Sequence, residues 1–232
     1  MNIPLSKRLK ACCDFVHSGD RVADIGCDHG YLSIYLLHNQ IASYVIAADI
    51  NPMPLQSAVA NAERFGVDSC IEFHLSNGVQ HIPQNFDTLV CAGMGADTMI
   101  SILENAPWLK NAQYRLILQC QSKAHILRNY LSKSGWHIRD EVVLRDGRFL
   151  YTIMEVCYEP NQPRLTPSET YFSPALLQHQ NSEVAEYYHG IVFRLNRTIS
   201  GKKDAADPTL VQAAKELNVL TSQYDFLKED PR

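Results

Sequence analysis

Two acidic residues and two glycines alternate in the stretch Asp24–Gly30, which reads Asp-Ile-Gly-Cys-Asp-His-Gly. The apolar run Val22–Ile25 predicts a buried strand, and the apolar pattern of Tyr31–His38 predicts a helix. A strand, a glycine-containing turn and a helix form the first unit of many nucleotide-binding sheets. Because carboxylates repel a pyrophosphate, this loop instead suits a ligand that carries a positive centre and an amino group.

A further carboxylate follows the next predicted strand. Residues Ser43–Asp49 are apolar almost throughout, as in a parallel strand that is covered on both faces, and the run ends in Asp49. Open α/β sheets place an acid at this position, about 20 residues after the loop, against the hydroxyls of a ribose. We therefore expect Asp49 to accept hydrogen bonds from both hydroxyls through its two oxygens.

These residues need a sheet to position them. After a first helix at 5–16, the apolar periodicity predicts strands at 70–75, 86–91 and 114–120, with helices at 52–65, 97–104 and 123–134. The segments Trp136–Arg145 and Arg148–Cys157 flank Asp146-Gly147, a strong signal for a hairpin turn. Five strand–helix units closed by a hairpin predict an α/β fold, namely a Rossmann-like seven-stranded sheet of the class I methyltransferase type.

The C-terminal part has a different pattern. Residues 159–174 include four prolines, which predicts a linker. Residues 175–199 and 209–227 repeat apolar side chains at helical spacing on either side of a polar turn at 201–208, which predicts an antiparallel, coiled-coil-like helical hairpin. Two helices packed on the main domain remain an alternative. We therefore divide the chain into a catalytic domain at 1–158, a linker at 159–174 and a hairpin domain at 175–232.

Composition narrows the class of protein. The chain has 232 residues and seven cysteines, none of them in a C-x-x-C pair, which favours neither a disulfide framework nor a metal site. No apolar run approaches the roughly 20 residues that span a membrane, and the N-terminus lacks a signal-peptide pattern. We expect a cytoplasmic protein that binds neither membrane nor metal.

The formal net charge of −4 does not by itself indicate RNA binding, so any positive surface for RNA must be local. Two basic clusters are present, and each also fits an ordinary solvated helix face. They comprise Lys7, Arg8 and Lys10 near the N-terminus, and Arg194, Arg197, Lys202 and Lys203 near the C-terminus.

The motifs ADIGCDHGYL, SNGVQHI and AGMG, together with the C-terminal hairpin, resemble the bacterial tRNA (adenine(22)-N1)-methyltransferase family, TrmK, over nearly the whole chain. The resemblance implies S-adenosylmethionine as methyl donor and tRNA as partner, with transfer to N1 of an adenine. It implies that the donor is bound by Asp24, Gly26, Cys27, Asp28, Gly30, Asp49, Ile50, Asn77, Gly78, Ala92, Gly93 and Met94.

The implied reaction requires little covalent participation by side chains of the protein. Adenine N1 carries a lone pair, so alignment with the donor methyl is the main catalytic contribution. The methylated ring gains positive charge, which a nearby carboxylate would stabilise. Asp28 is the first candidate for this catalytic role and His29 the second. Contacts to the acceptor RNA are expected from Tyr31, Gly95, Arg8 and Lys7.

Three alternatives remain open at this point. The first is a class I methyltransferase with another RNA or small-molecule acceptor, and the second is a nicotinamide-dependent oxidoreductase on a Rossmann sheet. The third is a tRNA-binding protein without turnover, because Ala96, Cys120 and Gln121 depart from the family pattern. The sequence leaves open the oligomeric state, the set of tRNAs and the face of the hairpin that contacts RNA.

Overall fold

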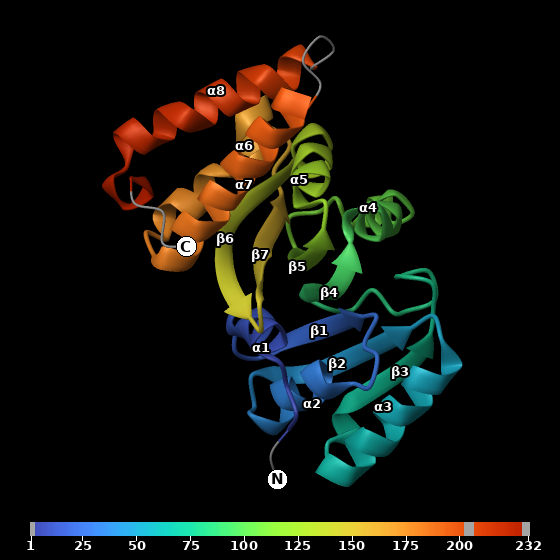
Figure 1. Cartoon of the computed structure of the whole chain (residues 1–232). Coiled ribbons are helices and arrows are strands. Elements are labelled where there is room, and N and C mark those ends of the chain that lie inside the picture. The colour runs from blue at the N-terminus through green and yellow to red at the C-terminus, as the bar shows by residue number, and fades with distance from the viewer. Residues whose placement is uncertain (1–2, 202–206, 229–232) are drawn as a thin grey trace.

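The computed structural model describes residues 3–201 and 207–228. It contains one seven-stranded sheet with the strand order β3-β2-β1-β4-β5-β7-β6 (Figure 1). Strands β1 to β5 run parallel, and β7 pairs antiparallel with both β5 and β6. The strands are β1 Asp20–Ile25, β2 Ala42–Asp49, β3 Ile71–Leu75, β4 Thr88–Gly95, β5 Arg115–Ser122, β6 Trp136–Asp146 and β7 Phe149–Tyr158.

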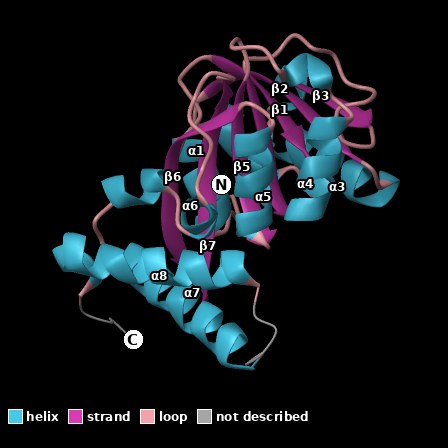
Figure 2. Ribbon diagram, turned by 90° about the horizontal axis from the view of Figure 1, so that it is seen from above, coloured by secondary structure: helices cyan, strands magenta, loops and turns pink. Residues whose placement is uncertain are grey.

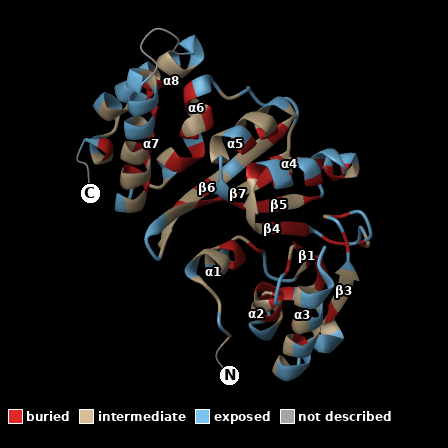
Figure 3. Ribbon diagram, turned by 45° about the vertical axis from the view of Figure 1, so that its right-hand side comes forward, coloured by how far each residue is buried: buried red, intermediate tan, exposed pale blue. Residues whose placement is uncertain are grey.

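Helices cover both faces of the sheet (Figure 2). Helices α1, α2 and α3 share one buried apolar cluster with the sheet, and α4 and α5 share another on the opposite face. Figure 3 shows the buried residues gathered along the strands between these helix layers. The helices are α1 Lys7–Asp14, α2 Tyr31–His38, α3 Pro52–Phe65, α4 Ala96–Glu104, α5 Ala124–Lys133, α6 Pro167–Tyr171, α7 Ser182–Gly201 and α8 Pro208–Gln223.

Local sequence explains the ends of several elements. Helix α3 begins with Pro52, whose missing N–H costs nothing in the first turn, and it ends at Gly66 with φ 67°. Helices α2 and α3 have the predicted bounds. Helix α5 begins one residue later than the predicted start at 123, because Ser122 still pairs with Gly95 in the sheet and Lys123 takes the cap position with φ 60°.

The C-terminal helices pack on each other and on the outer strand of the sheet. Val143 of β6 lies in the same buried cluster as Tyr188 of α7 and Leu217 of α8. The predicted helical hairpin is therefore present, and it also rests on the main domain, as the alternative proposed. Residues 159–174, predicted as a linker, include α6, and α7 begins at Ser182 rather than at 175. Most of the predicted polar turn, with Lys202 and Lys203, lies outside the described residues.

A buried ion pair ties the C-terminal segment to the sheet. The guanidinium of Arg128 on α5 bonds Glu141 of β6 at 2.6 Å, and both side chains are fully buried. Arg128 also donates to the backbone carbonyls of Thr170 and Tyr171. Removing either member of the ion pair would leave the other charge buried and unpaired, which is strongly destabilising. The bonds from Arg128 to the two carbonyls hold α6 against the main domain.

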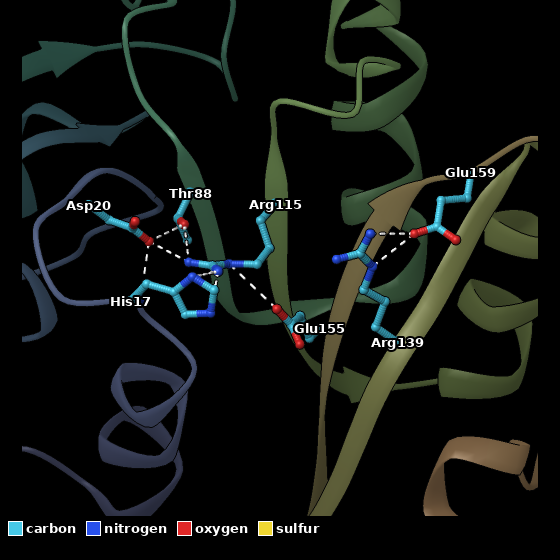
Figure 4. Close-up of polar contacts among 7 residues, drawn as sticks. All are labelled: His17, Asp20, Thr88, Arg115, Arg139, Glu155 and Glu159. Carbon is cyan, nitrogen blue, oxygen red and sulfur yellow. Dashed lines mark hydrogen bonds and ion pairs between the residues drawn. The ribbon is translucent and has the colours of Figure 1, made fainter.

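A polar network closes the opposite end of the strands from their carboxyl ends (Figure 4). Arg115 at the start of β5 pairs with Asp20 at the start of β1 and donates to Thr88 of β4 at 2.9 Å. Its Nε lies 3.5 Å from Glu155 of β7. One side chain thus joins four strands at their ends. No helix in the described ranges is long and apolar enough to cross a membrane.

Candidate functional site

A cavity of about 550 Å³ opens at the carboxyl ends of β1, β2 and β4. This is the place where the strand order reverses direction, and open α/β sheets bind ligands there. Its volume falls within the range of about 300–1,000 Å³ that small-molecule sites occupy. Three carboxylates line it, Asp24, Asp28 and Asp49, and Arg8 is the only lysine or arginine among its described lining residues.

The loop after β1 wraps one side of the cavity. Its backbone takes left-handed φ values at Gly26 (74°), Asp28 (50°) and Gly30 (73°). Left-handed φ is easy for glycine and costs an aspartate about 1 kcal/mol. The backbone N–H of Asp28 donates to Asp49 Oδ2 at 3.1 Å, so the next strand holds this loop in place. The Asp28 side chain itself stays exposed and faces the cavity beside His29.

Asp24 lies deepest, with 3% of its surface exposed. Its Oδ2 accepts a hydrogen bond from the hydroxyl of Ser33 on α2 at 2.7 Å. Burial raises the pKa of Asp24 to about 6, although the bonds from Ser33 act in the opposite direction. A buried carboxylate with one side-chain partner is poised to be stabilised by a cationic ligand.

Asp49 presents a carboxylate that its own backbone neighbours orient. Oδ1 accepts from the N–H of Asn51 at 2.8 Å and Oδ2 accepts from Asp28. Since an ionised carboxylate offers about four acceptor positions, both oxygens retain capacity for a ligand. The exposed side chains of Ile50 and Asn77 flank it at the mouth of the cavity.

The end of β4 forms the opposite wall. Gly93 has φ 80°, and its N–H donates to Gln119 Oε1 at 3.0 Å. Arg8 of α1 donates to the same oxygen at 2.9 Å, and a Cβ on Gly93 would lie only 3.2 Å from Arg8 Nη1. The side chain of Met94 reaches across to the loop, where a Cβ on Gly26 would lie 2.4 Å from it. Glycines at 26 and 93 therefore let the two walls approach each other.

Most of the predicted site residues line this one cavity. Three do not: Gly30 packs behind the loop against Ala58, Gly95 lies beside Ser122, and Lys7 is exposed on α1 while its neighbour Arg8 points inward. The predicted residues that line it are Arg8, Asp24, Gly26, Cys27, Asp28, His29, Tyr31, Asp49, Ile50, Asn77, Gly78, Ala92, Gly93 and Met94.

The sequence prediction missed the residue that links α1 to the end of β4. Gln119 is fully buried in β5, on the face of the sheet that carries α1, and its Nε2 has no hydrogen-bond partner among the described residues. A glutamine inside the apolar run 114–120 was the available signal, because a buried amide needs partners. The described residues hold no group of three or more histidine, cysteine or acidic side chains placed to bind a metal ion.

The acids and the glycine-lined walls fit a cationic nucleoside such as S-adenosylmethionine. Asp24 would face its amino group, Asp49 its ribose, and the loop around Gly26 its methionine part. The fit depends on two carboxylates. Asp24 is buried and has a raised pKa, and Asp49 is held in orientation by two backbone N–H groups and can still accept hydrogen bonds from a ligand.

Comparisons with known proteins show which family the chain belongs to. Residues 5–154 match the family model described as a methyltransferase domain. The tRNA (adenine(22)-N(1))-methyltransferase of Bacillus subtilis is 34% identical over 153 residues, which span 66% of this chain and 64% of that enzyme, just under two thirds of its length.

Two solved structures extend the match to the C-terminal helices. The crystal structure of the Bacillus subtilis m1A22 tRNA methyltransferase TrmK superposes with a TM-score of 0.79 at 28% identity and covers 100% of both chains. A Streptococcus pneumoniae protein solved in complex with S-adenosyl-L-methionine gives 0.80 at 30% identity, over 92% of this chain and 99% of that one. The chain belongs to the TrmK family of class I methyltransferases.

Proposed function

We propose that this protein transfers the methyl group of S-adenosylmethionine to N1 of adenine 22 in tRNA, as the name of its Bacillus subtilis relative states for that enzyme. The observation that carries the proposal is the cavity at the strand ends, where Asp24, Asp28 and Asp49 converge within the fold of this family. Since tRNA is its substrate, we place the protein in the cytoplasm.

The donor would lie along the loop and across the end of β2. Asp49 accepts hydrogen bonds from the ribose hydroxyls, and the Asp24 carboxylate attracts the amino group of the methionine part. Ile50 offers an apolar face to the adenine ring, and Asn77 offers hydrogen-bonding groups to its edge. These four residues thus separate the recognition of amino acid, sugar and base.

The acceptor would enter from the side of Gly93 and Met94. The donor would supply a methyl group on a sulfonium centre. The lone pair of adenine N1 would form the new N–C bond as the S–C bond breaks, and the S–C electron pair would stay on the sulfur of the neutral thioether that leaves. The chain contributes alignment, which is the largest part of such a reaction, and a carboxylate near the ring that becomes positive. The exposed Asp28 is the candidate for that carboxylate, with His29 beside it at 3.7 Å.

The target adenine must leave its stack before it reaches the donor, at a cost of a few kcal/mol. Tyr31 lines the cavity at the start of α2 and offers a ring on which the extruded base can stack. Arg8 and Lys7 place positive charge on α1 beside the cavity, where RNA phosphates would approach.

The test is methyl transfer to an unmodified tRNA transcript with radiolabelled donor. The matched control is the same transcript with guanine at position 22. The proposal expects label in the first RNA only. Equal label in both would place the acceptor elsewhere, and label in neither would remove tRNA as substrate.

A further inference from the structure

A second cavity of about 510 Å³ lies between the main domain and the C-terminal helices. It is formed at the end of β5, the start of α5, β7 and the inner face of α7. Gln121 lines both cavities. Gly95 pairs with Ser122 in the sheet, so the wall predicted to face the target base continues directly into this second cavity.

The charge of this cavity has one sign. Lys123, Arg128 and Arg194 line it, and no acidic side chain does so among the described residues. Arg128 is committed to Glu141, and Lys123 pairs with Asp97 at 2.7 Å across exposed side chains. The exposed Arg194 on α7 makes no ion pair within the described part of the chain. Arg194 and Lys123 are thus the two accessible cations at its rim.

Two stacked aromatic rings and a buried hydroxyl group also line this second cavity. His125 and Tyr171 stack on each other, with ring centroids 4.8 Å apart and an interplanar angle of 10°. Burial, followed by the charges of Arg128 and Arg194, lowers the pKa of His125. Thr152 is 2% exposed and lines the cavity, and its Oγ1 has no hydrogen-bond partner within the part of the chain that the structure describes.

Cations at a rim beside stacked rings are the combination by which proteins hold single-stranded RNA: phosphates meet the cations and bases meet the rings. Extruding one base also requires the backbone next to it to be gripped. We infer that the second cavity binds a nucleotide that neighbours the target adenine in the same RNA, with its phosphate at Arg194 and Lys123 and its base against His125 and Tyr171. This inference rests on the proposed function.

The experiment is steady-state methylation of unmodified tRNA by the full chain. Arg194→Gln should raise KM for tRNA about tenfold, because it removes one charged contact to a phosphate, and should lower the slope of affinity against salt by about 1. kcat and the donor Kd should stay unchanged. The matched control is Lys215→Gln, which removes one positive charge from an exposed position on α8 that lines neither cavity.

A second variant tests the cavity without changing charge. Thr198 is exposed and lines the cavity, so Thr198→Trp should fill it and raise KM to a similar extent while the melting temperature is retained. Wild-type KM in both variants would overturn the inference, and so would an equal loss in Lys215→Gln, which would reveal diffuse attraction. If the wild-type protein leaves tRNA unmethylated, both the proposed function and this inference are wrong. If the wild type methylates tRNA and both variants keep the wild-type KM, only this inference is wrong.

Discussion

The carboxylate of Asp49 accepts a hydrogen bond from the backbone N–H of Asp28 at 3.1 Å. The acid expected to bind the donor's ribose therefore also holds the loop that carries the candidate catalytic carboxylate. Donor binding and acceptor alignment thus both depend on the Asp49 carboxylate. Separate substitutions of Asp28 and Asp49 should distinguish the effect on catalysis from the effect on donor binding.

Asp49→Asn should weaken donor binding. The amide keeps one oxygen but replaces the other with a donor group, so it cannot accept from both the loop and two hydroxyls. Losing charged hydrogen bonds costs about 1.5–3 kcal/mol, or roughly tenfold to a hundredfold in Kd. Calorimetry with S-adenosylmethionine measures this, and Asp68→Asn, an acid outside the cavity, is the matched control. An unchanged Kd would remove Asp49 from the donor site.

Asp28→Asn should separate chemistry from binding. The Asp28 backbone N–H that bonds Asp49 survives the substitution, so donor Kd should change by less than about threefold. The lost negative charge near the methylated ring should lower kcat at least about tenfold. Comparing kcat with donor Kd tests this, and His29→Ala provides the neighbouring control with a smaller expected loss. Unchanged kcat would exclude Asp28 from catalysis.

Asp24 should link stability and donor affinity to pH. Its folded pKa of about 6 lies above the unfolded value of 3.8, so the folded state holds the proton more tightly. Stability from this group is thus present at low pH and is lost as pH rises from about 4 to 6.

The donor-free Asp24→Asn variant should therefore be more stable than wild type above pH 6, by an amount on the order of 1–3 kcal/mol, with the gap closing near pH 4. Its donor affinity should fall. In the wild type, donor affinity should weaken as pH drops below about 6, because the protonated acid no longer attracts the amino group. Thermal melts and calorimetry at several pH values measure both, and a gap independent of pH would contradict this account.

Arg128→Met should destabilise the fold by about 3–5 kcal/mol, because it leaves Glu141 buried and unpaired. Arg128→Met combined with Glu141→Leu should recover much of that loss, since both buried charges are then gone. Denaturant unfolding compares the two. If the double variant is as unstable as the single one, the bonds from Arg128 to the carbonyls of Thr170 and Tyr171 matter more than the pair.

Local patterns predicted much of the fold. The run Tyr31–His38 and the Pro52 to Gly66 signals gave the bounds of two helices, and Asp146-Gly147 placed the closing hairpin. β4 is longer than predicted, since Met94 and Gly95 still pair with β5 beyond an irregularity at Gly93. α7 starts late because Ala175 and Leu176 are buried in a separate short turn of helix.

The site was predictable where it depends on spacing along one loop and one strand. Asp24, Asp28 and Asp49 follow that rule. The contact between Arg8 and Gln119 joins residues 111 positions apart, and no periodicity encodes such a distance. The second cavity is likewise assembled from β5, β7 and α7, so only the fold brings its residues together.

Primer extension on tRNA from cells with and without this protein tests the methylation of adenine 22 most directly. A methyl group on adenine N1 blocks base pairing and stops the polymerase there. We expect a stop at adenine 22 that disappears without the protein and returns with the wild-type chain but not with Asp28→Asn. An identical stop pattern in both cell types would contradict it.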